Sequence, residues 1–256
     1  MKILVCIKQV PDMESKFKVD PEGLWYDSAD LAWRMNEYDE YAVEQAVRLK
    51  EQSGGDLTVL CIGADRVKET MKKALAMGCD RGLHVADDAV HTRDPYTIAS
   101  IIAEFARPKD FAVIFTGMQS QDRGSAQVGI LLAEMLGIPS LSTIVEFELG
   151  EKLIRAKREL EGGVKAKVSC ALPALVTCQL GLNTPRYPTL PNIMKAKKKE
   201  LLSVPVADIC KVAPLADTTT LYLPKKRGGG LILEGEPAEL ADRLITILRE
   251  KTAVLA

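Results

Sequence analysis

The chain has 256 residues, of which 47% are hydrophobic, so it can form one large domain or two small ones with a sizeable core. Its 34 basic and 35 acidic residues nearly cancel, which excludes a general electrostatic attraction to nucleic acid or to an anionic membrane. Any basic function must therefore be local.

The six cysteines include no CxxC pair and no zinc-finger spacing, and several lie within apolar runs. This pattern favours reduced, packed thiols in a reducing compartment. The two histidines, His84 and His91, share no sensible metal geometry with the cysteines, so we expect no metal site. Because the first apolar stretch is too short for a signal peptide and no run approaches the ~18 residues of a membrane span, we expect a cytoplasmic protein without membrane insertion.

Up to about residue 148, short apolar runs alternate with amphipathic helical windows. The runs with the composition of buried strands are residues 3–7, 57–62, 83–85 and 111–116. Apolar stripes at helical spacing lie at about residues 42–47, 67–75, 98–105 and 128–135. This order predicts an α/β fold with a Rossmann-like, doubly wound, mostly parallel sheet, in which ligands bind beyond the carboxyl ends of the strands.

The pattern changes between residues 145 and 177. The stretches there suggest a β-hairpin excursion with Gly162 and Gly163 at its turn, before residues 172–177 return to the core. Further on we expect an extended C-terminal arm that carries a helix from about Pro237 to Glu250. That helix can pack on its own domain or on a partner.

The loop GMQSQDRGSAQVG, residues 117–129, has the character of an anion cradle. Gly117 and Gly124 permit close backbone approach, Ser125 can cap the helix that follows, and free amides at a helix start favour a phosphate. The loop lacks the GK[ST] ending of a Walker A sequence. A nucleotide loop and an ordinary strand-to-helix turn both remain open, and Asp122 and Arg123 can be ligand contacts or solvated charges.

Asn36 precedes a predicted helix that has acidic residues in its first turn, so by itself it is best interpreted as a helix cap. Tyr38 can stack on a ring system or fill space. We find no set of nucleophile, base and orienting residue in the sequence. The chain therefore does not resemble a stand-alone catalyst.

The segment RYPTLPNIMKAKKKEL, residues 186–201, joins apolar Leu190, Ile193 and Met194 to a cluster of cations. The cations are Arg186, Lys195, Lys197, Lys198 and Lys199. An apolar tip beside positive charge suits docking on an acidic partner surface, and the spacing of Lys195, Lys198 and Lys199 predicts that they share a helix face. The alternative is a disordered loop that runs into a solvated charged face, and nucleic-acid binding is weakly supported.

At residues 157–201 the sequence KRELEGGVKAKVSCALPALVTCQLGLNTPRYPTLPNIMKAKKKEL resembles the signature region of the electron transfer flavoprotein beta subunit family. Further motifs agree in order: VCIKQVPD at 5–12, MNEYDEYAVEQAVRLKE at 35–51, ALAMGCDRGLHV at 74–85 and the loop 117–129. The resemblance covers most of the chain and is weakest at 201–236. It implies an adenine nucleotide alpha hydrolase-like fold.

The resemblance also implies partners and cofactors. In this family the beta subunit pairs with an alpha subunit that holds a redox-active FAD. The heterodimer carries electrons from dehydrogenases, often acyl-CoA dehydrogenases, to a quinone reductase or another acceptor. The common type buries AMP in the beta subunit, whereas the electron-bifurcating type holds there a second FAD that accepts hydride from NADH.

By position, the resemblance implies nucleotide contacts at Cys6 (through its backbone), Asn36, Ile62, Gly117, Gln119, Asp122, Gly124, Ser125, Gln127 and Val128. It places Tyr38 and Met13 near the alpha-subunit flavin, although many members have tyrosine at the position of Met13. Leu190 corresponds to the anchor of a partner-recognition loop at 184–200. Ile193, Met194, Lys195 and Lys198 would flank that anchor.

Residues 1–200 are thus expected to form the nucleotide-binding domain, and residues 201–256 an arm and helix that pack on the alpha subunit. The segment RGSAQVG departs from the DDDCNQTG of the AMP type and is closer to the bifurcating branch, whereas MNEYDEYAVEQA is closer to the AMP type. We favour AMP and keep the second FAD as the alternative. A nucleotide-sensing, stress-protein-like module that works without an alpha subunit is a further alternative.

Overall fold

The computed structural model describes residues 1–225 and 228–253 of the chain. It divides into two compact units, Met1–Leu221 and Tyr222–Ala256, which we describe separately. Residues 201–221, which the sequence analysis grouped with the C-terminal arm, belong to the first unit. Within the described residues, no helix combines the length and the apolar character that crossing a membrane requires.

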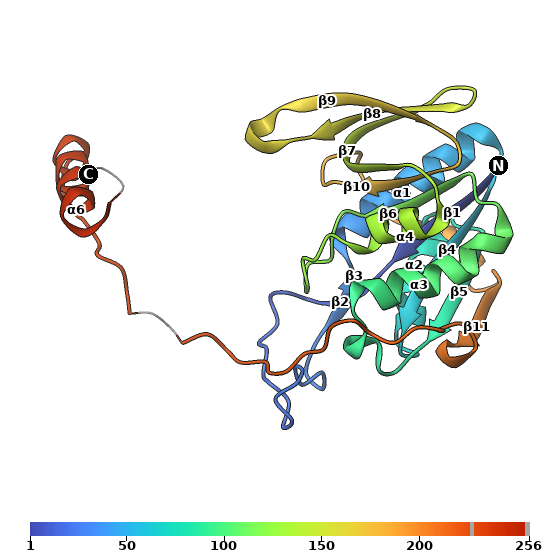
Figure 1. The fold of residues 1–256 in the computed structure, drawn as a ribbon, viewed down its shortest axis with the longest axis horizontal. Helices are drawn as coiled ribbons and strands as arrows, with labels where there is room; N and C mark the ends of the chain where they lie inside the picture. The colour runs from blue at the N-terminus through green and yellow to red at the C-terminus, as the bar shows by residue number, and fades with distance from the viewer. Residues whose placement is uncertain (226–227, 254–256) are drawn as a thin grey trace. The chain divides into compact units, whose positions relative to one another are not determined.

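Among the described residues, the first unit is built on a nine-stranded sheet with the order β11-β5-β4-β1-β6-β10-β7-β8-β9 (Figure 1). The strands are β1 (Lys2–Ile7), β4 (Asp56–Gly63), β5 (Arg81–Ala86), β6 (Val113–Gly117), β7 (Ser140–Leu149), β8 (Leu153–Glu159), β9 (Lys165–Ala171), β10 (Ala174–Cys178) and β11 (Leu201–Pro205). Pairing is parallel from β11 to β7 and antiparallel in β7-β8-β9. The predicted doubly wound, mostly parallel sheet and the β-hairpin excursion are both confirmed.

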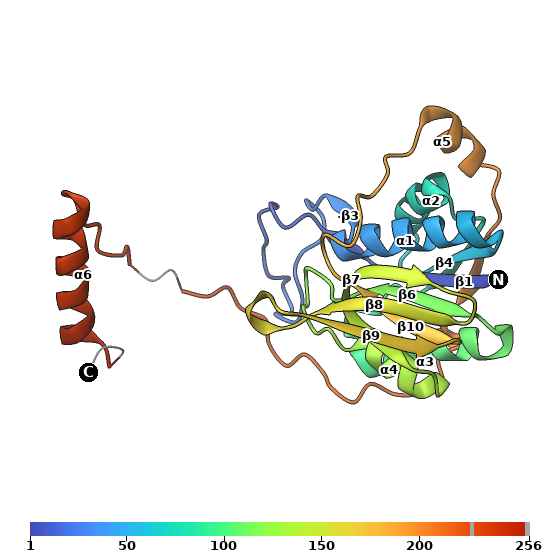
Figure 2. The same ribbon diagram turned by 90° about the horizontal axis from the view of Figure 1, so that it is seen from above.

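Helices cover both faces of this sheet (Figure 2). One face carries α1 (Glu37–Ser53), α2 (Val67–Met77) and α5 (Leu190–Ala196), and the other carries α3 (Pro95–Ala106) and α4 (Val128–Leu136). The short 3-10 turns are η1 (Val90–Thr92), η2 (Arg107–Lys109), η3 (Glu161–Gly163) and η4 (Val206–Asp208). A separate antiparallel pair, β2 (Gln9–Pro11) and β3 (Trp33–Met35), follows the end of β1.

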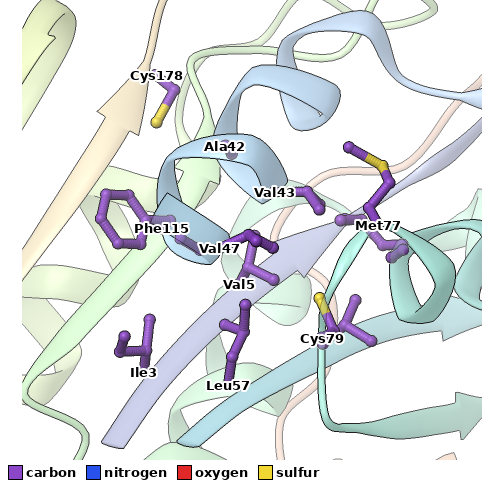
Figure 3. Close-up of a cluster of buried hydrophobic side chains, with 14 of the residues drawn as sticks. Ile3, Val5, Ala42, Val43, Val47, Leu57, Met77, Cys79, Phe115 and Cys178 are labelled. Atoms are coloured by element: carbon purple, nitrogen blue, oxygen red, sulfur yellow. The ribbon is translucent and has the colours of Figure 1, made fainter. Parts of the chain in front are cut away.

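The core has two layers because side chains alternate along a strand. In β1, Ile3 and Val5 pack with α1 and α2, whereas Leu4 packs on the opposite face with α3 and α4. Figure 3 shows the first layer, where Val43 and Val47 of α1 meet β1. Burying both faces requires continuous apolar runs in the central strands, and this is why the sequence pattern was readable there.

The second unit contains α6 (Pro237–Lys251), close to the helix expected at 237–250. Its N-terminus has Pro237 at the first helical position, which fixes φ without loss of a helical hydrogen bond. Leu244 and Ile245 are exposed within this unit.

Candidate functional site

A cavity of about 480 Å³ lies in the first unit, where β1, β4 and β6 end. Its lining includes Cys6, Ile62 and Gly117 from the carboxyl ends of these three strands. This size lies within the range of small-molecule sites. The structure thus places a cavity at the strand edge to which the sequence pointed.

The cavity gathers most of the residues expected to contact a nucleotide. The lining ones are Cys6, Asn36, Ile62, Gly117, Gln119, Asp122, Ser125, Gln127 and Val128. Gly124 lies in the same loop but is not among the lining residues, and its positive φ of 60° serves the turn instead. The structure therefore brings together residues from four separated parts of the sequence, as the interpretation of this loop as a binding loop requires.

Asn36 holds the loop between β6 and α4. Its Nδ2 donates to the carbonyl of Gln119 at 2.8 Å, and its Oδ1 accepts from the backbone N–H of Gln121 at 3.0 Å. Although Asn36 stands directly before α1, its side chain makes no hydrogen bond that caps the helix. Asn36 thus holds the expected N-cap position of α1, but its side chain serves the loop, which takes up both polar ends of the amide.

Asp39, which lines the cavity, joins the ends of β1 and β6. Its buried carboxylate accepts from the backbone N–H of Lys8 at 2.7 Å and of Gly117 at 3.1 Å. Burial raises the pKa of Asp39 to about 7, although these backbone hydrogen bonds favour the charged form. A Cβ at Gly117 would overlap the Asp39 carboxylate and lie 2.8 Å from the Cβ of Tyr38, so only glycine fits this contact.

Asp122 is the partner of Lys8, a residue that the sequence analysis did not single out. The Lys8 Nζ lies 2.6 Å from Oδ2 of Asp122 and 3.3 Å from Oγ of Ser120. Burial lowers the pKa of Lys8, and the Asp122 carboxylate opposes that shift. Since only 7% of the Asp122 side chain is exposed, its interpretation as a solvated loop charge is wrong.

Arg123 is likewise directed onto the protein. Its guanidinium donates to the carbonyls of Arg93, at 3.0 Å, and His91, and lies 4.7 Å from the ring centroid of Trp25. This arrangement ties the loop 118–127 to the segment before α3.

The N-terminus of α4 faces the cavity. Gln127 is its N-cap and makes no side-chain cap bond, so the expected cap by Ser125 is wrong. Ala126 has a positive φ of 53°, which turns the chain just before the helix. The first amides of a helix have no helical carbonyl to bond and attract anions. A Cβ at Gly129 would lie 2.7 Å from Thr116 Oγ1, so glycine lets α4 pack close to the sheet.

The cavity also has an aromatic and cationic wall that the sequence analysis missed. Both tryptophans of the chain, Trp25 and Trp33, line it together with Tyr26. Trp25 and Tyr26 have ring centroids 4.5 Å apart, and the guanidinium of Arg66 lies 3.9 Å from the ring centroid of Trp33. The signal was present, because aromatic residues are only 5% of the chain and three of them lie within residues 25–33.

Tyr38 and Met13 lie outside the lining of the cavity. The Tyr38 hydroxyl accepts from Nε2 of Gln119 at 3.1 Å, so its polar end supports the loop. Met13 is 47% exposed.

The predicted docking segment forms α5 and its flanks, and its apolar residues are exposed. Leu190 is 72% exposed, and Ile193 and Met194 are exposed as well. The helix ends at Ala196, so the prediction that Lys195, Lys198 and Lys199 share a helix face is wrong.

Within residues 1–225 and 228–253, no group of histidine, cysteine or acidic residues could hold a metal ion.

Comparison with known proteins shows which family the chain resembles. Residues 23–209 match the electron transfer flavoprotein domain model. The chain is 38% identical to an electron transfer flavoprotein subunit beta of Bacillus subtilis over the full length of both chains. It is 34% identical to that of Methylophilus methylotrophus over 98% of each, and 33% identical to that of Mus musculus over 91% of this chain and 93% of the relative.

Proposed function

Since the chain belongs to the electron transfer flavoprotein beta subunit family, we propose that it pairs with an alpha subunit and binds adenine nucleotide. In this role the heterodimer carries electrons in the cytoplasm from a dehydrogenase of the acyl-CoA type to a quinone reductase or another acceptor. The family is one of electron-transfer subunits, and the observation that carries the nucleotide proposal is the cavity enclosed by loop 118–127.

We propose AMP as the nucleotide. The N-terminus of α4 suits the phosphate, because the side chain of its N-cap Gln127 makes no capping bond and Gly129 lets the helix lie close to the sheet. Ile62, Ile98 and Ile102 supply an apolar wall that suits adenine. Oε1 of Gln9, another lining residue, is buried without a hydrogen-bond partner among the described residues, so it can accept from an amino or hydroxyl group.

One observation favours the second candidate, a FAD in the same cavity. Trp25, Tyr26 and Trp33 extend the lining beyond what an adenylate needs, and Arg66 and Arg123 stack on two of these rings. An aromatic wall with two cations suits a larger, doubly phosphorylated ligand with a second ring system. In that case the protein would also take part in oxidation of NADH.

The ligand released from the native heterodimer distinguishes these candidates. Mass spectrometry after denaturation is expected to find AMP, and the visible spectrum is expected to give one flavin per heterodimer. Two flavins per heterodimer with no AMP would replace the first candidate by the second. A heterodimer free of nucleotide would reject the proposed cavity.

The proposed mechanism assigns no bond chemistry to side chains of this chain. FAD, held mainly by the alpha subunit, supplies the redox chemistry. Tyr38 and Met13 would border the flavin, and α6 would pack on the alpha subunit through its exposed apolar residues. The chain would then serve to fix the nucleotide and present the docking segment.

For docking, we propose that Leu190 inserts into the dehydrogenase. Leu190→Ala is expected to raise the KM for the flavoprotein about tenfold, because burying a leucine side chain contributes about 1.5–3 kcal/mol. The measurement is electron acceptance from an acyl-CoA dehydrogenase reduced by its acyl-CoA, with nucleotide content as the control. Unchanged kinetics in this variant would remove Leu190 from the docking site.

A further inference from the structure

The chain just before the docking segment is fixed to helix α1 by a series of polar contacts. Asn183 Nδ2 donates to the carbonyl of Tyr41 at 3.0 Å, and Arg48 Nη2 donates to the carbonyl of Thr184 at 3.3 Å. These bonds join positions more than 130 residues apart in the sequence. The exposed part of the segment therefore begins from a fixed point.

Arg186 makes most of these contacts. Its Nε lies 2.8 Å from Oε2 of Glu44, and its Nη1 lies 2.6 Å from Oε1 of Glu51. Its Nη2 reaches both carboxylates, at 3.2 Å and 3.1 Å, and its backbone N–H donates to Glu44 at 3.2 Å. A guanidinium can hold two carboxylates in one plane in this way, which a lysine cannot.

Glu44 is the fixed half of this arrangement. Only 3% of its side chain is exposed, and it also accepts from Arg48 Nε at 2.6 Å. Burial acts to raise the pKa of Glu44, but the hydrogen bonds from Arg186 and Arg48 outweigh it, so the pKa is lowered. A buried carboxylate with two guanidinium partners resists rearrangement, because loss of either partner leaves a charge unpaired.

The other end of the segment is fixed by Lys199. Its Nζ donates to the carbonyls of Leu75, at 2.8 Å, and Cys79, at 2.6 Å, at the C-terminus of α2. Helix α2 has no basic residue of its own in its last turn, so Lys199 supplies the favourable charge there. Ala196 is buried beside it.

Between these two fixed ends, the side chains turn outward. Tyr187 is 91% exposed, and Leu190 and Met194 are more than half exposed. Thr189 caps α5 within the segment and Ala196 is buried in the core, but the exposed apolar side chains gain nothing in water from this shape, so the bonds at the two ends add to the order. Ordering the segment before an encounter removes part of the entropy cost of binding.

We propose that Arg186, held by Glu44 and Glu51, is a positioning residue that preorganises the segment 187–198 for docking on the dehydrogenase. The inference rests on the proposed docking function. Arg186 does not itself touch the dehydrogenase in this arrangement, because its guanidinium is occupied by the two carboxylates. Glu51, which lies on α1, thereby influences docking without taking part in it.

The test uses the heterodimer with its flavin and two conservative variants, Arg186→Lys and Glu51→Gln. Each is expected to raise the KM for the flavoprotein about fivefold, which corresponds to about 1 kcal/mol, and to change kcat less. Hydrogen exchange of residues 187–198 is expected to accelerate in both variants before any dehydrogenase is added. The double variant is expected to be little worse than Arg186→Lys alone, because both changes break one contact.

Glu69→Gln is the matched control for charge. Glu69 pairs with Lys72 at 2.6 Å on the exposed side of α2, so the change removes one negative charge on the same face of the sheet without touching the segment. Glu69→Gln is expected to leave the hydrogen-exchange rates of residues 187–198 unchanged. Arg186→Lys keeps the charge of the wild type, so its effect cannot be one of net charge.

The outcomes separate this inference from the proposed function. If Leu190→Ala raises the KM whereas Arg186→Lys and Glu51→Gln leave both KM and exchange unchanged, docking stands and the positioning role is overturned. If Leu190→Ala has no effect, the docking function fails first. A rise in KM for Arg186→Lys with unchanged exchange of residues 187–198 would make Arg186 a direct contact and would also reject the positioning role.

Discussion

At the carboxyl edge of the sheet, polar side chains turn inward and hold a loop around a cavity, whereas around α5 apolar side chains turn outward. Asn36 and Asp39 bind backbone groups of the loop and of β6, and both are buried. Leu190 and Met194 are exposed, and the bonds of Arg186 and Lys199 fix the two ends of their segment to the rest of the unit. Both regions are thus held by hydrogen bonds and ion pairs, but one encloses polar groups whereas the other exposes apolar side chains to solvent.

The difference shows where each region is vulnerable. In the cavity region, Asn36 and Asp39 are buried and bonded to the backbone, so leaving one of their polar atoms unpaired costs about 1–3 kcal/mol and affects the fold. In the docking segment, apolar residues already contact water, so their replacement changes binding more than stability. Substitutions in the two regions should therefore separate effects on stability from effects on transfer.

Gly117→Ala is expected to have the largest effect. The added Cβ would overlap the carboxylate of Asp39, which cannot move because it is bonded to the backbone of Lys8. Overpacking of this kind costs about 2–3 kcal/mol and should lower the melting temperature of the heterodimer by about 6 °C or more. The nucleotide content should fall with it.

Gly229→Ala is the control, because nothing lies within 4 Å of an added Cβ there. Its melting temperature and nucleotide content are expected to match the wild type. If Gly117→Ala melted like this control, the close contact of β6 with Asp39 would not be part of the folded protein.

The pH dependence of stability tests Asp39 with a smaller expected effect. The folded-state pKa of Asp39, about 7, exceeds the ordinary value of 3.8, so between these values the folded state binds the proton more tightly than the unfolded chain. This contribution therefore decreases as pH rises toward 7 and stays low above it. From about pH 5.5 to pH 8, the free energy of unfolding should therefore fall by about 1–2 kcal/mol because of Asp39.

Asp39→Asn cannot titrate, so its stability should depend less on pH over this range. At pH 5.5 the variant is expected to be less stable than the wild type. Its amide NH₂ group would face one of the two backbone N–H groups that bond to the Asp39 carboxylate in the wild type. Thermal unfolding of both heterodimers across the range measures the two slopes. Equal slopes would assign the dependence to other groups.

The sequence predicted the parts of the fold in which local pattern and burial agree. Residues 3–7 read as a buried strand because both faces of β1 are covered, and the hairpin excursion was visible from its glycine turn. Strand β11, in contrast, lies at the edge of the sheet and depends on pairing with β5, over 100 residues earlier. Edge strands carry a weak local signal because only one side is paired.

The candidate site was predicted where backbone motifs define it and missed where distant side chains complete it. The glycines of loop 117–129 mark a close approach that is visible in the sequence. The bonds of Asn36 to this loop could not be predicted, because its partners lie 83 and 85 residues away in the sequence, whereas the local pattern indicates a helix cap. The ion-pair partners of Lys8 and Arg186 were not predictable for the same reason, since a salt bridge between distant elements leaves no periodicity in the sequence.

The smallest expected effect distinguishes lysines that look equivalent in the sequence. Lys195 and Lys198 are exposed, whereas Lys199 is bonded to carbonyls of α2. Lys195→Gln with Lys198→Gln should therefore reduce, about twofold, the slowing of electron acceptance between about 0.01 M and 0.1 M salt, because screening acts on exposed charges. Lys199→Gln should leave that salt dependence unchanged and instead lower stability by about 0.3–1 kcal/mol, since it removes a cation from a helix C-terminus. Stopped-flow kinetics at several salt concentrations, with melting temperatures of the same samples, measure both quantities. If the three lysines contributed alike to the salt dependence, Lys199 would be free in solution, and the segment would lack the fixed end that its bonds to α2 provide.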